Sequence, residues 1–111
     1  MISAGEGRYL VNLVYLLIGE DILILITGGK EHIGGVSLVE NNSFSNMYKK
    51  NHKDNVISDM VAPFIYDSLK KDILVICGIH IDDATPDDID TLINNAKECA
   101  EKFLKKVNND N

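Results

Sequence analysis

The sequence of 111 residues has the length of one globular domain, and we expect a single domain over residues 1–111. Its 45% hydrophobic and 25% charged content argues against a disordered chain. The formal net charge of −6, without a continuous basic stripe, argues against nucleic-acid binding. A chain of this size closes one two-layer core, so we expect sites at an edge or between subunits.

The N-terminal part of the sequence shows neither a secretory signal nor a membrane-spanning segment. Residues 1–8 lack the basic and apolar segments of a secretory signal. The apolar stretch of residues 9–27 is broken by Asn12 and by residues 19–21, which leaves less than the roughly 20 residues of a spanning helix. We therefore expect a soluble protein of the cytoplasm.

The first half of the chain predicts three strands. These segments are rich in Val, Ile and Leu and lie at residues 9–18, 22–27 and 33–40. The short turn at residues 19–21 favours an antiparallel hairpin of the first two strands. Gly34 and Gly35 suggest a bulge or a close backbone approach at the start of the third. We expect the three strands to form a meander, followed by a long polar surface connection over residues 41–55.

A helix is predicted from Val56 onward, because apolar residues recur there on one helical face. They are Ile57, Met60, Val61, Phe64, Ile65 and Leu69. Pro63 falls within this pattern, so we expect either a kink or a helix that starts closer to Pro63. Residues 73–81 predict another strand with little alternation.

The clearest local signal precedes the second helix. Thr85 is a strong N-cap residue, and Pro86 suits the first helical position. Asp87 and Asp88 place negative charge at the positive end of the helix, whose apolar stripe continues to Val107.

The order β-β-β-α-β-α predicts an α+β fold with an antiparallel-dominated sheet and two helices packed against it. The predicted strands are apolar on both faces. If both helices cover one face, the other face needs a partner, and we expect a homodimer.

Histidines and one aspartate are the first candidates for a site. His80 and Asp82 are one residue apart at a strand end, so both side chains project from one face if the chain stays extended. An imidazole and a carboxylate can hold Mn²⁺, Zn²⁺ or Fe²⁺. The alternative is that His80 bonds a backbone group and Asp82 helps to cap the next helix. His32 and His52 are equally consistent with exposed loop residues.

Two glycine pairs, Gly28-Gly29 and Gly34-Gly35, could bring backbone N–H groups close to a phosphate, although a flexible hairpin end explains them as well. The sequence contains no Walker A motif, dinucleotide fingerprint or nucleophile elbow. Its two cysteines lie in apolar surroundings, which favours buried reduced thiols.

Three segments together resemble one known family. They are Thr-Gly-Gly-Lys-Glu-His-Ile-Gly-Gly-Val at residues 27–36, His-Lys-Asp at 52–54 and Gly-Ile-His-Ile-Asp-Asp-Ala-Thr-Pro at 78–86. They resemble the LpdD-type prenylated-flavin chaperones over about residues 7–104. Members accompany UbiD-type hydroxyaryl decarboxylases, such as gallate decarboxylase, and carry reduced prenylated FMN to the large subunit. Asn51 stands where the family pattern has glycine, and residues 42–50 have no clear counterpart.

The resemblance implies a non-catalytic accessory protein. The glycine pairs would approach the cofactor phosphate, and His52 would close over the site. The remaining residues, which would hold a divalent cation or a polar edge of the cofactor, are His32, His80 and Asp82. A small metal-dependent enzyme and a structural assembly subunit remain alternatives.

Overall fold

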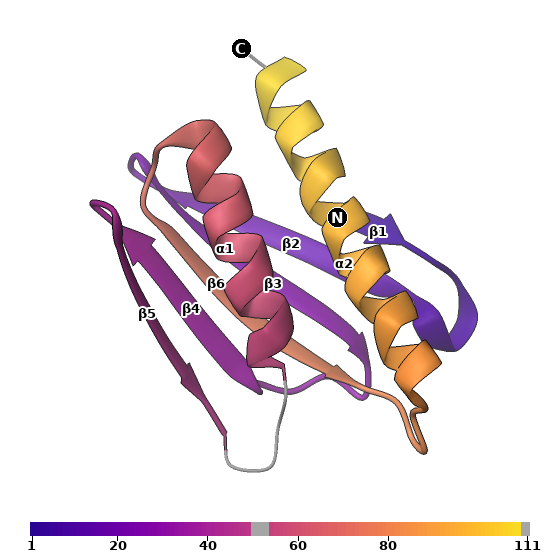
Figure 1. Ribbon diagram of the computed structural model, residues 1–111. Coiled ribbons are helices and arrows are strands. Elements are labelled where there is room, and N and C mark those ends of the chain that lie inside the picture. The colour runs from indigo at the N-terminus through magenta and orange to yellow at the C-terminus, as the bar shows by residue number, and fades with distance from the viewer. Residues whose placement is uncertain (50–53, 110–111) are drawn as a thin grey trace.

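The protein is described by a computed structural model that covers residues 1–49 and 54–109. Along the chain these residues form β1 (Ile2–Ala4), the 3-10 turn η1 (Gly7–Tyr9), β2 (Val11–Ile18), β3 (Asp21–Gly29), β4 (Gly35–Glu40), β5 (Ser43–Tyr48), α1 (Asn55–Leu69), β6 (Ile73–His80) and α2 (Pro86–Asn109). The strands form one six-stranded, mostly antiparallel sheet, and both helices lie on the same face of it (Figure 1). The predicted α+β class is confirmed.

The predicted hairpin of the first two long strands is also confirmed. β2 and β3 pair in antiparallel fashion, with Ile18 opposite Asp21 across a two-residue turn. Gly19 in this turn has a φ of 61°, a conformation that glycine adopts at little cost.

The expected meander is wrong, because the third strand does not pair with the second. The strand order is β1-β2-β3-β6-β4-β5. β6 lies between β3 and β4, parallel to the first and antiparallel to the second. β3 and β6 carry apolar residues on both faces, which suits central strands, and so the late strand takes a place in the middle of the sheet.

The expected long polar connection over residues 41–55 is wrong for residues 43–48, which form β5, while residues 50–53 lie outside the described part of the chain. β5 follows β4 through a two-residue turn, in which Asn41 and Asn42 have φ values of 45° and 63°. Positive φ at both positions is typical of the tight hairpin turns that favour asparagine. Every residue of β5 is exposed, so this edge strand lacks the apolar alternation by which strands are usually predicted. The short strand β1 was not predicted either.

The helices supply the second layer of the core. α1 begins at Asn55, so a start shifted toward Pro63 is wrong. It packs on β4 and β6, while α2 packs on β1 and β2. Phe103 of α2 is fully buried and meets Tyr15 of β2 edge to face, with ring centroids 4.9 Å apart. Neither helix, over the residues described, is long and apolar enough to cross a membrane.

Candidate functional site

Two segments singled out in the sequence meet where β3 and β6 end. Gly29 lies opposite His80 in the parallel pair, and the Lys30 N–H donates to the His80 carbonyl at 2.9 Å. The chain then crosses the end of β6 to reach β4. This crossing requires glycine at position 78, because a Cβ there would collide with the His32 carbonyl. Sequence spacing alone could not predict this crossing.

His80 and Asp82, whose spacing predicts side chains on one face, are in contact with each other. His80 Nε2 and Asp82 Oδ1 lie 3.2 Å apart, and Lys30 Nζ donates to Asp82 Oδ2 at 3.1 Å. The hydrogen bond from Lys30, followed by that from His80, lowers the pKa of the Asp82 carboxyl. The Asp82 carboxylate therefore bonds His80 and Lys30. The start of α2 is capped by Thr85 and Asp88 instead.

His32 contacts a different carboxylate. Its Nε2 lies 2.9 Å from Asp54 Oδ2, and its Nδ1 lies 3.2 Å from the Lys30 carbonyl. The other oxygen of Asp54 accepts the Ile79 N–H at 3.0 Å, and only 8% of the Asp54 side chain is exposed. A Cβ at Gly34 would collide with this carboxylate, so the glycine makes room for it.

Asp54 was not among the predicted site residues. An acidic residue directly before a helix is normally an N-cap, but Asp54 makes no side-chain cap hydrogen bond. Its oxygens instead join the helix start to β6 and to His32. The only sequence signal was its place in the His-Lys-Asp segment at residues 52–54.

The predicted metal ligands are thus divided between two pairs, His80 with Asp82 and His32 with Asp54. Over residues 1–49 and 54–109, no group of three His, Cys, Asp or Glu side chains is placed to hold a metal ion. His52, the third predicted histidine, lies outside the described residues. The cation site therefore gains no support from the part of the chain described.

The glycine pairs make close approaches, as expected, but to the chain's own atoms. A Cβ at Gly28 would lie 2.8 Å from the Leu10 carbonyl, and one at Gly29 would collide with the His80 carbonyl. A Cβ at Gly35 would lie 2.5 Å from the first backbone nitrogen of α1. Packing explains the small size of these residues, and their contact with a phosphate stays a prediction.

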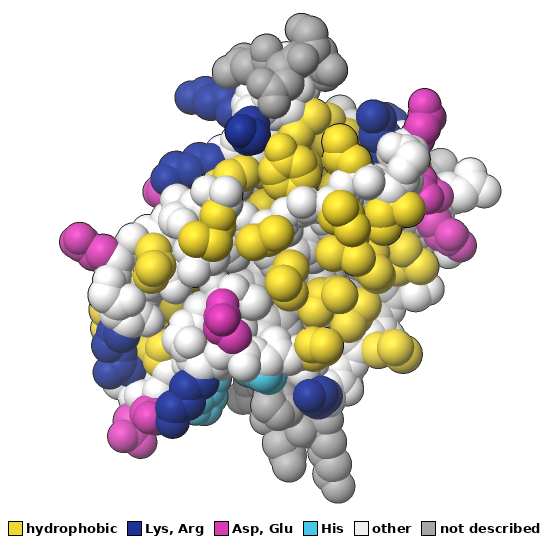
Figure 2. Space-filling model, turned by 180° about the vertical axis from the view of Figure 1, so that it is seen from behind, with side chains coloured by type: hydrophobic (Ala, Val, Ile, Leu, Met, Phe, Trp, Pro, Cys, Tyr) yellow, Lys and Arg dark blue, Asp and Glu magenta, His cyan; other side chains and the backbone are white. Residues whose placement is uncertain are grey.

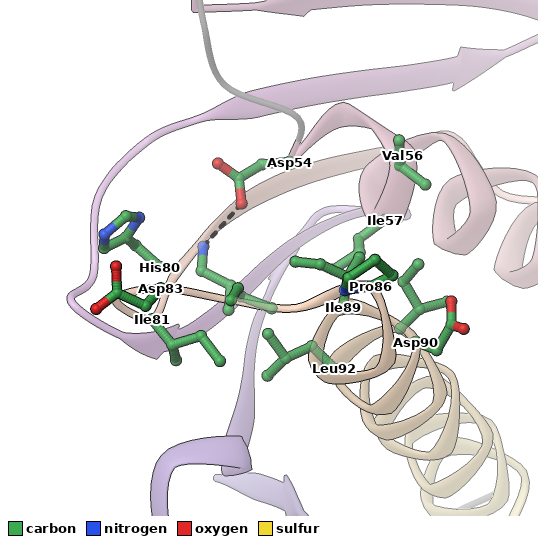
Figure 3. A pocket seen from close by; sticks show the side chains of 13 residues that line it. Asp54, Val56, Ile57, His80, Ile81, Asp83, Pro86, Ile89, Asp90 and Leu92 are labelled. Carbon is green, nitrogen blue, oxygen red and sulfur yellow. Dashed lines mark hydrogen bonds between the residues drawn. The ribbon is translucent and has the colours of Figure 1, made fainter.

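A cavity of about 660 Å³ opens beside these pairs, between the starts of both helices and the end of β6 (Figure 3). Its nearly buried walls are aliphatic: Ile57, Ile79, Ile81 and Leu92. Val56, Pro86 and Ile89 also line it, together with the polar residues Asp54, His80, Asp83 and Asp90. Of the predicted site residues, His80 lines this cavity. Two stretches far apart in the sequence, residues 54–57 and 79–93, build it, so the sequence carried no local signal for it.

Both cysteines are buried, as predicted. Burial raises the pKa of both thiols, that of Cys99 to about 11. Cys99 also donates to the Val11 carbonyl at 3.4 Å. Both side chains therefore remain neutral thiols at physiological pH and pack as part of the core.

Comparison with known proteins bears on the role of this edge. A family model described as the prenylated flavin chaperone LpdD-like domain matches residues 5–108. Protein LpdD of Lactiplantibacillus plantarum is 33% identical over an alignment of 90 residues, and the match covers 75% of this chain and 66% of that protein. The matched part thus falls just short of two thirds of the relative's length. Because the family model covers nearly the whole sequence, the chain belongs to the LpdD-like prenylated flavin chaperone family.

Proposed function

We propose that this chain is a non-catalytic cytoplasmic accessory protein that binds reduced prenylated FMN and delivers it to a UbiD-type aromatic acid decarboxylase. Membership of the family supports a prenylated flavin chaperone role. The observation that carries the proposal is the cavity of about 660 Å³, which falls in the size range of small-molecule sites and has mostly aliphatic walls. Such walls can shield an apolar ring system from water and dissolved oxidants.

The charges around the cavity favour one way of holding the cofactor. Asp54, Asp83 and Asp90 line it, and carboxylates would repel a phosphate. We therefore place the apolar rings inside and the phosphate at the opening. Lys30 is a cation close by, because it bonds Asp82, which in turn contacts His80 at the cavity wall.

The geometry favours the predicted phosphate contact by the glycine pairs less than a contact by Lys30, because backbone N–H groups in this region already donate to carbonyl groups of the protein. The Gly34 N–H already donates to the Cys77 carbonyl at 2.9 Å, and the neighbouring Lys30 N–H is also used within the sheet edge. A divalent cation at His80 and Asp82 would need further ligands beyond these two side chains. We therefore favour Lys30 as the phosphate contact and test the cation separately.

The cavity is tested by substitution of one of its wall residues. Ile89 lines the cavity and is 44% exposed, so Ile89→Asp should fold normally while placing a charge against the bound rings. We expect anaerobic titration with reduced prenylated FMN to show affinity at least about tenfold weaker than wild type. Leu17→Asp, at a site 59% exposed and outside the cavity, is the control and should bind normally. Equal affinity of Ile89→Asp and wild type would reject the cavity.

His80 is tested in the same titration. His80→Ala should lose affinity for the reduced cofactor without a change in melting temperature, because about half of the side chain is exposed. Separate titrations with Mn²⁺ and Zn²⁺ show whether a cation takes part. A lower melting temperature with unchanged affinity would make His80 a structural residue.

A further inference from the structure

The opening of the cavity combines exposed apolar and acidic side chains. Val56 at the start of α1 is 52% exposed, Ile89 in the first turn of α2 is 44% exposed, and both line the cavity. Asp83 and Asp90 also line it and are exposed. Figure 3 shows Asp83 with His80 on one side of the cavity and Asp90 with Ile89 on the other. An apolar centre with a polar rim is the usual composition of a protein interface. We call these four residues, Val56, Asp83, Ile89 and Asp90, together with the neighbouring Asp87, the cavity mouth.

Most of the negative charge at the cavity mouth has no cationic partner. Five aspartates and no basic residue lie between residues 81 and 90. Two of the five are paired, one with Lys30 and one with Arg8. The three that form no ion pair within the described part of the chain are Asp83, Asp87 and Asp90. All three are exposed, so their charges act on whatever approaches the opening.

The charge of α2 is divided along its length. Acidic residues occupy its start, whereas residues 97–106 contain four lysines and two glutamates. The helix has 24 residues and is therefore about 36 Å long. This separation exceeds the distance over which salt screens charges in the cell. A positively charged surface is consequently attracted to the cavity mouth and repelled by the other end of the helix.

The sheet face turned away from the helices offers no comparable attraction. Figure 2 shows that this face is broadly hydrophobic, with acidic and basic side chains mainly around its margin. The homodimer expected from the sequence would cover it and stays a prediction. The cavity lies between the helix starts, on the other side of the sheet, so this dimer would leave the mouth accessible to a different protein.

We propose that the cavity mouth is the surface on which the decarboxylase docks, with the positively charged entrance of its own cofactor site. The inference rests on the proposed function, because an oxidation-sensitive cofactor is protected during transfer only if the two openings face each other. A site that accepts a phosphate group holds it with cationic side chains or helix N-termini. Its entrance is therefore positive and complementary to the acidic mouth.

The same acidic groups favour release of the cofactor in the right orientation. Asp83 and Asp90 repel the phosphate, which keeps it at the opening, where the cations of the decarboxylase bind it first. Val56 and Ile89 supply apolar contact between the two proteins around the opening. The charges thus steer the encounter, and the apolar residues seal it against water.

A second copy of the chain fits the mouth less well than a basic partner. Two acidic mouths repel each other, and the whole chain carries a net charge of −6. The lysine-rich end of α2 in another copy is the remaining basic surface, and its contact with the mouth would be head to tail. Such contacts form open chains unless the rotation between copies closes a ring.

Two charge reversals on α2 provide a matched test. Asp87 and Glu101 are exposed and lie about 21 Å apart along the helix, and only Asp87 is near the mouth. Asp87→Lys and Glu101→Lys change the net charge by the same two units. The measurement is the association rate with the purified, cofactor-free UbiD-type decarboxylase of the same organism, at low and at high salt.

We expect Asp87→Lys to associate about tenfold more slowly than wild type at about 20 mM salt, because it reverses a charge that steers the encounter. Glu101→Lys should associate at the wild-type rate. The difference should largely disappear at about 500 mM salt, where the charges are screened. Circular dichroism checks that each variant is folded, and Asp87→Asn, with an expected decrease of about threefold, replaces Asp87→Lys if the latter is not.

The outcomes separate this inference from the proposed function. If the wild type binds the reduced cofactor but Asp87→Lys associates as fast as wild type, the docking surface is wrong and the proposed function stands. If the wild type binds no cofactor, both are rejected. Equal slowing of both variants shows that overall charge, and not the mouth, steers the encounter. Self-association of the chain alone that Asp87→Lys abolishes assigns the mouth to a second copy.

Discussion

At the start of α2, Thr85 and Asp88 cap each other. The Asp88 N–H donates to Thr85 Oγ1 at 3.1 Å, and the Thr85 N–H donates to Asp88 Oδ2 at 2.9 Å. This is a capping box with aspartate in the place usually taken by glutamate or glutamine. The N-cap role predicted for Thr85 is confirmed, while the reciprocal role of Asp88 went unpredicted, since its negative charge alone explained its place there.

Removal of the cap should be measurable. Thr85→Ala should lower the free energy of unfolding by about 1 kcal/mol, because the Asp88 N–H loses its acceptor. Urea denaturation followed by circular dichroism measures the change. Thr91→Ala is the control, since the Thr91 hydroxyl donates to the Asp87 carbonyl one turn earlier in the same helix. An unchanged midpoint for Thr85→Ala would contradict the cap.

Asp88 also makes stability depend on pH. The backbone hydrogen bond from Thr85, followed by that from the Tyr9 hydroxyl, lowers the pKa of Asp88 below its ordinary 3.8. The stabilisation is therefore complete above pH 3.8 and is lost as the pH falls through the lower folded-state pKa. Asp88→Asn should lower stability at pH 7 and flatten the decline below pH 3.8.

Tyr9→Phe gives an intermediate test of the same carboxylate. The Tyr9 hydroxyl donates to Asp88 Oδ1 at 2.6 Å, so its loss should raise the pKa of Asp88 part of the way toward the ordinary value. Denaturation series from neutral to acid pH should place its decline between those of wild type and Asp88→Asn. Identical profiles for all three proteins would show that Asp88 contributes no pH dependence.

Residues with local partners were predictable, and residues with distant partners were not. Thr85 acts on a residue three positions away, and the sequence pattern contains both. The Asp54 carboxylate reaches His32 and the Ile79 N–H, which are 22 and 25 positions away. No spacing rule connects them, because the crossing of β6 brings them together.

Elements show the same division between local and distant causes. Apolar composition predicted β2, β3, β4 and β6, and it could not say which of them are neighbours, since pairing is decided across the chain. β5 was missed because an exposed edge strand buries no side chain. The two asparagines before it, Asn41 and Asn42, did carry a hairpin signal.

Because the chain crosses β6 at Gly78, adding one methyl group at this position should destabilise the protein strongly. Gly78→Ala should lower the free energy of unfolding by about 3 kcal/mol, because the added Cβ collides with the backbone carbonyl of His32. Gly19→Ala is the matched control, since a Cβ there meets nothing within 4 Å and its φ of 61° alone costs about 1 kcal/mol. If urea denaturation gave the same loss of stability for Gly78→Ala and Gly19→Ala, the backbone at the crossing would be able to move away from the added methyl group at little cost.

At the scale of the whole molecule, composition and element order were enough for the fold class. Two amphipathic helices and strands apolar on both faces leave a two-layer arrangement with one face uncovered, and both features were predictable. The cavity was not, because its walls come from the starts of α1 and α2 and the end of β6. Their meeting depends on the strand order that the sequence left open.

The position of β6 between β3 and β4 affects how the chain folds during its synthesis on the ribosome. Two hairpins, β2–β3 and β4–β5, can form as soon as their residues emerge. In the described sheet they are joined through β6, which is translated only after α1. Until then the inner edges of β3 and β4 have unpaired backbone groups, and β3 is the more apolar. The nascent chain is therefore most prone to aggregate in the interval before residue 80 is exposed, and late, long-range closure by β6 should limit the rate of folding.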